Sequence, residues 1–556
     1  MKEYMRSKYK ACTPEETVER IKRSLQENGM ETEETWIESG VNSICSVRIH
    51  LKGTPIGQNG KGTDRAYALA SGYAEFLERL QTGYLFPECA KEPFDRRWME
   101  PAEILEAGGE LLAGSFRQIR LSETETSNEH LKQTLEAGKE SPDSAALTSF
   151  LRDWSFDARD GKLAVIPFRD LKHNQEYVIP ESILRAFYFT NGSCAGNTRE
   201  EALVQGLSEI AERYACGRIM RERLTPPLVP EEAFAGIPIL EEAIHAIRQM
   251  GYDLRIMDAS LGMGLPVLAA VLSDRKKAKT VLRFGAHPKF EVALERCLTE
   301  ILQGRHIDRL ETSPVYDYGK DADSTGILNR FNFMKAAFGQ FPVQLYGSTP
   351  SWICEPFAQA PEDAEGMLSY MISLYDRLGW EIYIRDCSFL GFPTYQLVVP
   401  GKSMVFDFGE ERLKEKSMIC EFRNALHSPD PWSWENMRKA RRLAVLKMGF
   451  LIENTFWFLA GLPVYPKLLG LDLDAGLLAG LTSLAMFDRK RAEVFFQPYC
   501  FDGNGDITGI YPIVQLLKGH MSEDVYAAME CICGKERAEA AKDVIQNPEK
   551  YLPVLE

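Results

Sequence analysis

The spacing of apolar positions switches between the two periods of regular structure along most of the chain. Residues 43–51 alternate apolar and polar as a half-buried strand does. Further strands are predicted from short apolar runs at 163–168, 254–257, 267–272, 280–284, 381–384 and 395–399. The run Thr13-Pro14-Glu15-Glu16 predicts a helix start, because threonine can cap, proline fits the first helical position and Glu16 can close a capping box. Interleaved strands and helices favour the α+β class.

Two changes in pattern suggest how the chain is divided. Residues 108–148 are rich in Gly, Ser, Thr and Glu and lack strand periodicity, so we expect a partly mobile surface insertion there. After about Asn424 the strand-like runs stop, and prolines and helical spacing take over. We therefore predict one domain over residues 1–425, with the insertion, and a mainly helical domain over residues 426–556.

One helix pattern recurs along the chain, and it is the most informative feature of the sequence. Residues 62–79 and 196–213 share Gly, Arg, Ala-Leu and Gly at the same offsets. Both end in Glu-x-x-Glu-Arg, which aligns Glu75, Glu78 and Arg79 with Glu209, Glu212 and Arg213. A third stretch follows more loosely, since Ala293-Leu294 precedes Glu300 and Gln303 at the same offsets, with Arg296 between them.

Each copy predicts the same chemistry. A glycine-bearing turn leads into a helix, and the short polar residues Thr63 and Asn197 near its start can serve a cap or an anion. Glutamates at i and i+3 share one helix face, and clustered carboxylates suit a hard cation such as Mg²⁺. If the helices converge, they form a nucleotide site without the G-x-x-x-x-G-K-[ST] loop, which the sequence lacks. A purely structural duplication with salt-bridged helix faces is the alternative.

Composition narrows the class of protein further. The chain of 556 residues is 45% apolar and 26% charged, as in folded globular proteins. A formal net charge of −15 argues against nucleic acid or an anionic membrane as a partner. The 12 cysteines form no C-x-x-C pair and the 8 histidines are dispersed, so neither a zinc site nor a disulfide scaffold is expected. With no signal segment and no apolar run of membrane-spanning length, we expect a cytoplasmic protein.

From about Lys10 to Leu413 the sequence resembles the YcaO family. The strongest parts are residues 59–62 with the first motif helix, 191–213, 284–305 and 398–401. The resemblance implies a YcaO fold, in which β-sheets pack with the motif-bearing helices, and implies ATP and Mg²⁺ as cofactors.

The resemblance also implies roles for single residues, by motif position. Metal-linked carboxylates are implied at Glu75, Glu78, Glu209, Glu212 and Glu300. Nucleotide contacts are implied at Lys10, Thr17, Ser71, Asn197, Glu201, Gln205, Arg213, Arg296, Glu300 and Gln303. The residues expected to act on the transferring phosphoryl group are Glu78, Glu212, Arg213 and Arg296. For Lys10 and Thr17 a surface lysine and a first-turn helix residue are the alternative.

The activity that the resemblance implies is ATP-dependent phosphorylation of an amide in a peptide or protein. Within the family the chain most resembles stand-alone bacterial members that assist methylthiolation of ribosomal protein S12. The implied partners are a peptide or protein substrate, an S12 methylthiotransferase or S12 itself, and a second copy of the chain. The chain departs from azoline-forming members in lacking their P-x-P-x-P tail, since only Pro553 occurs near its end. A thioamide- or azoline-forming synthetase and a non-catalytic ATP-binding adaptor are the alternatives.

Overall fold

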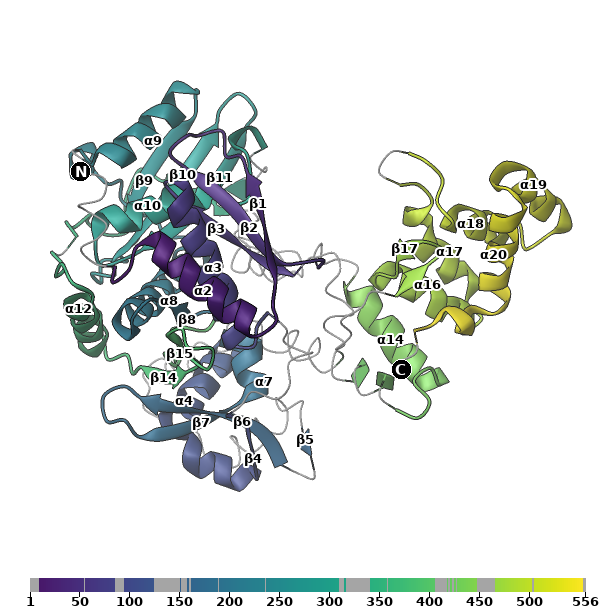
Figure 1. The fold of residues 1–556 in the computed structure, drawn as a ribbon, viewed down its shortest axis with the longest axis horizontal. Helices are drawn as coiled ribbons and strands as arrows, with labels where there is room; N and C mark the ends of the chain where they lie inside the picture. The colour runs from purple at the N-terminus through teal and green to yellow at the C-terminus, as the bar shows by residue number, and fades with distance from the viewer. Residues whose placement is uncertain are drawn as a thin grey trace. The chain divides into compact units, whose positions relative to one another are not determined.

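The computed structural model forms two compact units, each described by itself below (Figure 1). One unit comprises Met1–Leu85 and Pro93–Gly409, and the other comprises Phe86–Glu92 and Glu410–Glu556. The sequence placed the division after residue 425. The structure describes residues 10–54, 56–85, 95–124, 158–159, 162–188, 190–235, 237–309, 315–316, 341–357, 359–405, 428–447, 466–502 and 505–553, with isolated residues between them.

The first unit begins with a helix and a small antiparallel sheet. Helix α2 (Pro14–Glu27) has the predicted capping box, in which the Thr13 hydroxyl accepts from the Glu16 amide and the Glu16 carboxylate accepts from the Thr13 amide. The sheet has the order β1-β2-β3, with β1 at Thr32–Ile37, β2 at Cys45–Leu51 and β3 at Gly57–Gly62. Helix α3 (Arg65–Gln81), the first motif helix, packs against β3 and β2.

A second antiparallel sheet supports the third motif helix. Its order is β11-β10-β9, with β9 at Asp253–Asp258, β10 at Val267–Asp274 and β11 at Lys279–Ala286. Helix α10 (Phe290–Ile301) packs on β11 and β10, and α9 (Pro238–Gln249) packs on β9. Helix α8 (Arg199–Glu222), the second motif helix, contacts β11 and also α12 (Ala364–Arg377). The main core lies between these elements, around Leu207, Ile210 and Leu282.

The largest sheet carries the strand that precedes α8. Its central path is β4-β6-β14-β15-β8, and β5 and β7 both pair with β6. The strands span Arg97–Met99 (β4), Ala158–Arg159 (β5), Lys162–Asp170 (β6), Glu176–Pro180 (β7), Ser193–Ala195 (β8), Tyr383–Asp386 (β14) and Thr394–Val398 (β15). Each predicted strand overlaps an observed one. A short helix, α7 (Glu181–Ile183), continues into a π-helical turn at Leu184–Tyr188, and β12 (Val315–Tyr316) pairs with β13 (Phe341–Pro342).

The predicted surface insertion at 108–148 is wrong in its first part. Helix α4 covers Pro101–Thr124 and packs on β7. Leu111 and Leu112 are buried, with exposed fractions of 0% and 1%. Gly109 has a non-helical φ of 48° inside the element, and this kink interrupts the apolar spacing that would have revealed the helix. Residues 125–148 lie outside the described part of the chain.

The second unit is mainly helical, as the sequence predicted. Its helices are α14 (Trp434–Lys447), α16 (Ala475–Ala485), α17 (Arg489–Phe496), α18 (Ile510–Lys518), α19 (Glu523–Cys533) and α20 (Lys535–Gln546). A two-strand hairpin of Lys467–Leu468 (β16) and Leu471–Asp472 (β17) precedes α16. The unit has a core of its own, which includes Leu477, Phe496 and Ile513. In the described parts of both units, none of the helices has the length and apolar character to span a membrane. The α+β class is confirmed.

The three motif helices pack on their preceding strands through one recurrent close contact. Gly60 of β3 faces Gly72 of α3, and a Cβ built on Gly60 would lie 2.5 Å from the Gly72 amide nitrogen. At the second copy, a Cβ on Gly206 of α8 would lie 2.8 Å from the Cys194 Sγ of β8. At the third copy, a Cβ on Gly285 of β11 would lie 2.9 Å from the Sγ of Cys297 in α10. Since each pair has at least one glycine, we infer that close helix–strand approach is the feature the copies share.

Asp64 caps the motif helix α3, whereas the sequence suggested its neighbour Thr63. The Asp64 carboxylate accepts a hydrogen bond from the Tyr67 amide at 3.0 Å, and Thr198 caps α8 in the same way. Replacing Asp64 by alanine is expected to lower the free energy of unfolding by about 1 kcal/mol, whereas serine retains a capping oxygen and most of the stability. Urea denaturation of both variants checks this, and equal losses would argue against a capping role.

Candidate functional site

The three motif helices surround a single cavity of about 790 Å³ in the first unit. Every residue that the sequence assigned to metal, nucleotide or catalysis lines it: Lys10, Thr17, Ser71, Glu75, Glu78, Asn197, Glu201, Gln205, Glu209, Glu212, Arg213, Arg296, Glu300 and Gln303. The roles of these residues stay predictions. Their convergence means that the recurrent pattern builds one site from segments far apart in the sequence.

Among the residues that the structure describes, acidic and basic side chains line this cavity in equal number. The acidic ones are Glu75, Glu78, Glu201, Glu209, Glu212, Glu295 and Glu300. The basic ones are Lys10, Lys61, Arg79, Arg213, Arg283, Arg296 and Arg305. Carboxylates crowded in this way would repel one another without the cations between them.

The end of α3 carries the first carboxylate group. The Arg79 guanidinium forms ion pairs with both Glu78 and Glu75, the latter at 3.5 Å. Burial raises the pKa of the Glu78 carboxyl to about 8, against the opposing charge of Arg79 and with help from Glu209 and Glu75. Burial also raises the pKa of Glu209. Glu78 therefore takes up a proton at higher pH than an exposed glutamate does, in spite of the Arg79 guanidinium beside it.

This shift predicts how the stability of the ligand-free protein depends on pH. The Glu78 pKa rises from 4.5 to about 8 on folding, so the folded state binds more protons than the unfolded state in that window. The free energy of unfolding is therefore expected to fall as pH rises from about 5 to 8. Thermal unfolding of wild type and Glu78→Gln without Mg²⁺ checks this, because glutamine does not titrate and should flatten the decline. Parallel slopes in the two proteins would refute the assignment.

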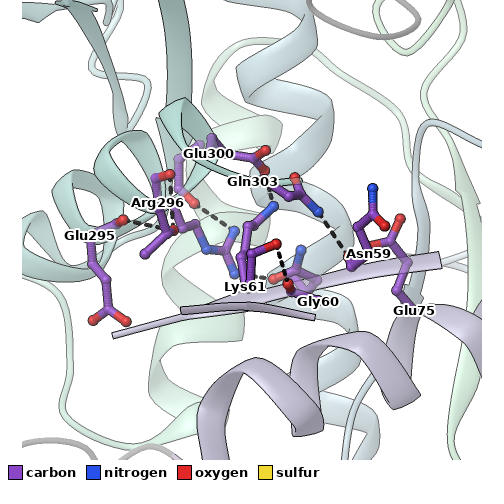
Figure 2. Close-up of polar contacts among 12 residues, drawn as sticks. Asn59, Gly60, Lys61, Glu75, Glu295, Arg296, Glu300 and Gln303 are labelled. Atoms are coloured by element: carbon purple, nitrogen blue, oxygen red, sulfur yellow. Dashed lines mark hydrogen bonds and ion pairs between the residues drawn. The ribbon is translucent and has the colours of Figure 1, made fainter. Parts of the chain in front are cut away.

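Lys61, Glu300 of α10 and Gln303, just after α10, form a second polar group in the cavity lining (Figure 2). The Lys61 ammonium, which comes from β3, forms an ion pair with the Glu300 carboxylate. The Gln303 side-chain amide donates to the Asn59 carbonyl oxygen at 2.8 Å. These contacts connect the strand that leads into the first motif helix to the third copy of the motif.

A third group joins the N-terminal segment to α8 and α10. Lys10 Nζ lies 3.6 Å from the Glu201 carboxylate, and the Thr17 hydroxyl donates to the Asn197 side-chain oxygen at 3.0 Å. Arg296 hydrogen-bonds the Gln205 side-chain oxygen and also donates to the Ala286 carbonyl at 2.8 Å. Lys10 and Thr17 therefore lie beside the motif residues Glu201 and Asn197, and their contact with a nucleotide stays a prediction.

The donor set suits Mg²⁺ and phosphate, although the carboxylates do not converge. Among the residues described, no three acidic, histidine or cysteine side chains are grouped closely enough to hold a metal ion. Arg79 holds Glu75 and Glu78, and Lys61 holds Glu300. Carboxylate oxygens are the ligands that Mg²⁺ prefers, and lysine and arginine are the usual phosphate partners. The residues present fit ATP with Mg²⁺ once these internal pairs change partners.

Four of the cavity's cations were missed by the sequence reasoning: Lys61, Arg79, Arg283 and Arg305. Lys61 lies within the Asn59–Gly62 segment that carries the family resemblance, but a single lysine on a glycine-rich strand gave no sign of its direction. Arg79 ends the first motif as Arg213 ends the second, so the register between the two copies could have identified it.

The fold and the cavity define a class: an α+β protein with a carboxylate- and cation-lined site of a kind suited to metal and phosphate, built without a Walker A loop. Residues 59–403 match the family model described as YcaO cyclodehydratase, ATP- and Mg²⁺-binding. The chain belongs to the YcaO family, and ATP and Mg²⁺ are the cofactors of that family.

Individual relatives agree with the family match. The chain is 30% identical over 426 residues to the ribosomal protein S12 methylthiotransferase accessory factor YcaO of Escherichia coli, covering 76% of this chain and 70% of that protein. It is 27% identical over 427 residues to a protein of Haemophilus influenzae, covering 75% and 69%.

Solved structures are more distant in sequence. A heterocyclase solved with substrate and cofactor is 21% identical with a TM-score of 0.49, and the match covers 73% of this chain but only 54% of that chain, about half its length. YcaO from Methanopyrus kandleri, solved with AMPPCP and Mg²⁺, is 18% identical with a TM-score of 0.41, covering 71% and 92%.

Proposed function

We propose that the chain uses ATP and Mg²⁺ to phosphorylate an amide oxygen in a peptide or protein, as an accessory factor in the methylthiolation of ribosomal protein S12. One observation supports the site above others: the predicted glutamates and basic residues of three separate segments line one cavity. Family membership supports ATP-dependent amide activation. The S12 role is inferred from the name of the E. coli relative.

The proposed division of labour gives each side chain the role that the family resemblance implies for its motif position. Glu75, Glu78, Glu209, Glu212 and Glu300 would hold Mg²⁺, which neutralises charge on the phosphates. Arg213 and Arg296 lie in the same cavity and would stabilise the charge of the transferring phosphoryl group. Lys10, Thr17, Asn197 and Glu201, already joined by hydrogen bonds and an ion pair, would orient the nucleotide together with Ser71, Gln205 and Gln303.

The proposed reaction first phosphorylates the amide oxygen and then replaces that oxygen with a nucleophile. The amide oxygen attacks the γ-phosphorus, the bond to the β-phosphate oxygen breaks, and ADP leaves. The amide carbon is now electrophilic because its oxygen carries a good leaving group. A thiol, hydroxyl or sulfide attacks this carbon, loses its proton, and phosphate departs with the former amide oxygen.

The S12 role is tested by complementation. In a strain of the source organism that lacks this chain, S12 is expected to lose its methylthio group, as seen by mass spectrometry of the purified ribosomal protein. Wild type should restore the modification, and a Glu78→Gln/Glu212→Gln variant expressed at the same level should not. Full modification of S12 in the deletion strain would reject the S12 role. Restoration by the variant would reject the need for the site.

A thioamide- or azoline-forming synthetase uses the same first step and differs in its substrate. Amide activation itself is tested with a candidate substrate, beginning with S12, whose backbone amides carry ¹⁸O. Phosphorylation of the amide oxygen predicts that ¹⁸O appears in the released phosphate. Phosphate free of ¹⁸O during substrate-dependent ATP turnover would mean that water attacks ATP directly.

The second unit favours an additional adaptor role. Several of its large apolar side chains are exposed, among them Phe487 at 87%, Val494 at 63% and Ile532 at 58%. If these side chains form one contiguous patch, the patch would be a surface for binding another protein. A pull-down with residues after Asn424 deleted separates the roles. Loss of partners with retained ATP turnover would assign docking to this unit, and ATP binding without any turnover would favour a non-catalytic adaptor.

A further inference from the structure

Lys61 is the cation that connects two copies of the motif inside the cavity. Its ammonium forms an ion pair with Glu300 of α10, which is 239 residues away in sequence. The side chains of Lys61 and Glu300 are 21% and 28% exposed, both within the cavity lining. The negative charges of Glu75 and Glu212 also act on this ammonium. Lys61 therefore lies among carboxylates from all three motif helices.

The direction of Lys61 is fixed by the glycines on either side of it. A Cβ on Gly60 would lie 2.1 Å from the Ala68 carbonyl oxygen, and one on Gly62 would lie 2.6 Å from the Ala68 amide nitrogen. Both glycines therefore face α3. Because side chains alternate along a strand, Lys61 points away from α3 and towards α10, as Figure 2 shows. Because Gly60 and Gly62 pack on α3 at one face of β3, the Lys61 side chain extends from the opposite face of the strand into the cavity.

The pair that Lys61 forms with Glu300 opposes the binding of Mg²⁺ alone to that carboxylate in the ligand-free protein. A carboxylate that is already neutralised by an ammonium gains little from a second cation, and the ammonium would be left without a partner if the metal displaced it. A phosphate provides that partner, since lysine binds phosphate well as a point charge. Metal and nucleotide together can therefore separate Lys61 from Glu300, whereas either alone leaves one charge uncompensated.

We propose that Lys61 holds Glu300 in the ligand-free protein and moves to the nucleotide phosphates when Glu300 turns to Mg²⁺, so that Mg²⁺ and ATP bind interdependently. The inference rests on the proposed nucleotide site and names a residue to which that site assigned no role. Lys61 is a positioning residue for the metal and a contact for the phosphates. Its removal changes the coupling free energy between the two ligands.

Two calorimetric titrations of Lys61→Met test the exchange. Mg²⁺ alone is expected to bind more tightly than to wild type, because Glu300 is no longer paired. ATP in saturating Mg²⁺ is expected to bind on the order of tenfold or more weakly, because a charged hydrogen bond to phosphate is lost. Lys61→Arg keeps the charge and should restore most of the ATP affinity. If Lys61 had a purely structural role, replacing it would weaken the binding of both ligands. Tighter binding of Mg²⁺ together with weaker binding of ATP would therefore exclude that role.

The control is Lys52→Met, which removes another lysine of the same region. Lys52 is 58% exposed, pairs with Glu31 at 2.7 Å and lies outside the cavity, so both affinities should stay at wild-type values. Unchanged affinities in Lys61→Met, or weaker binding of Mg²⁺ alone, would overturn the exchange and leave the nucleotide site intact. Failure of wild type to bind ATP with Mg²⁺ would overturn both.

Discussion

Replacing Glu78 and Glu212 together by glutamine is expected to abolish Mg²⁺-dependent ATP binding. Both side chains line the cavity, one from each of the two best-matching motif copies. The change barely alters side-chain size but removes two of the carboxylates that we propose hold Mg²⁺. Loss of about 100-fold or more in affinity is expected, because even indirect partners of metal ligands cost 10- to 100-fold. Isothermal titration with ATP, with and without Mg²⁺, measures it.

The same variant also predicts how ATP binds in the absence of Mg²⁺. Removing two carboxylates leaves basic side chains in excess, so ATP without Mg²⁺ is expected to bind at least as well as it does to wild type. Glu242→Gln, on the exposed face of α9, is the matched control and should bind like wild type. Unchanged Mg²⁺-dependent affinity in the double variant would mean that the recurrent glutamates are structural. The duplication would then be scaffold only.

Gly60→Ala is expected to destabilise the first unit severely. The added methyl group would lie 2.1 Å from the Ala68 carbonyl oxygen and 2.5 Å from the Gly72 amide nitrogen. Both are backbone atoms, so neither can move aside by a rotamer change. The free energy of unfolding should fall by about 3 kcal/mol or more, at or above the usual cost of overpacking. Thermal unfolding monitored by circular dichroism measures the loss.

A second glycine separates this steric effect from the loss of glycine itself. A Cβ on Gly53 has no heavy atom within 4 Å, although its φ of 73° is left-handed. Gly53→Ala should therefore cost only backbone strain, about 1 kcal/mol. If the two variants lost equal stability, the close approach of β3 and α3 would not be the constraint that we describe.

The motif helices could be predicted because their pattern repeats, whereas some of their supporting strands could not. Strand β3 reads Gly-Gln-Asn-Gly-Lys-Gly and has no apolar position. It is a strand because β2 pairs with it and α3 covers its glycines. Helix α4 was hidden for the opposite reason, since Gly108 and Gly109 resemble a loop while Leu111 and Leu112 pack on the sheet. Tertiary contacts outweighed local propensity in both cases.

The residues lining the cavity could be named from sequence, but their ion pairs could not. Aligning the copies of the motif identifies equivalent positions. The side chains at these positions line the same cavity because the three motif helices pack around it. Lys61 and Glu300 come from different copies, so no spacing within either copy predicts that they meet. The same holds for Lys10 and Glu201. Pairing across copies depends on side-chain directions that only the packed helices and strands determine.

The equal number of acidic and basic side chains in the cavity has a consequence for the speed of nucleotide capture. Opposite charges held in close pairs produce little field beyond a few ångströms, so the described lining contributes little to drawing ATP in from solution. The chain as a whole carries a net charge of −15 and repels the anionic nucleotide. Electrostatic steering is thus absent, and added salt, which screens the repulsion, should accelerate association rather than slow it.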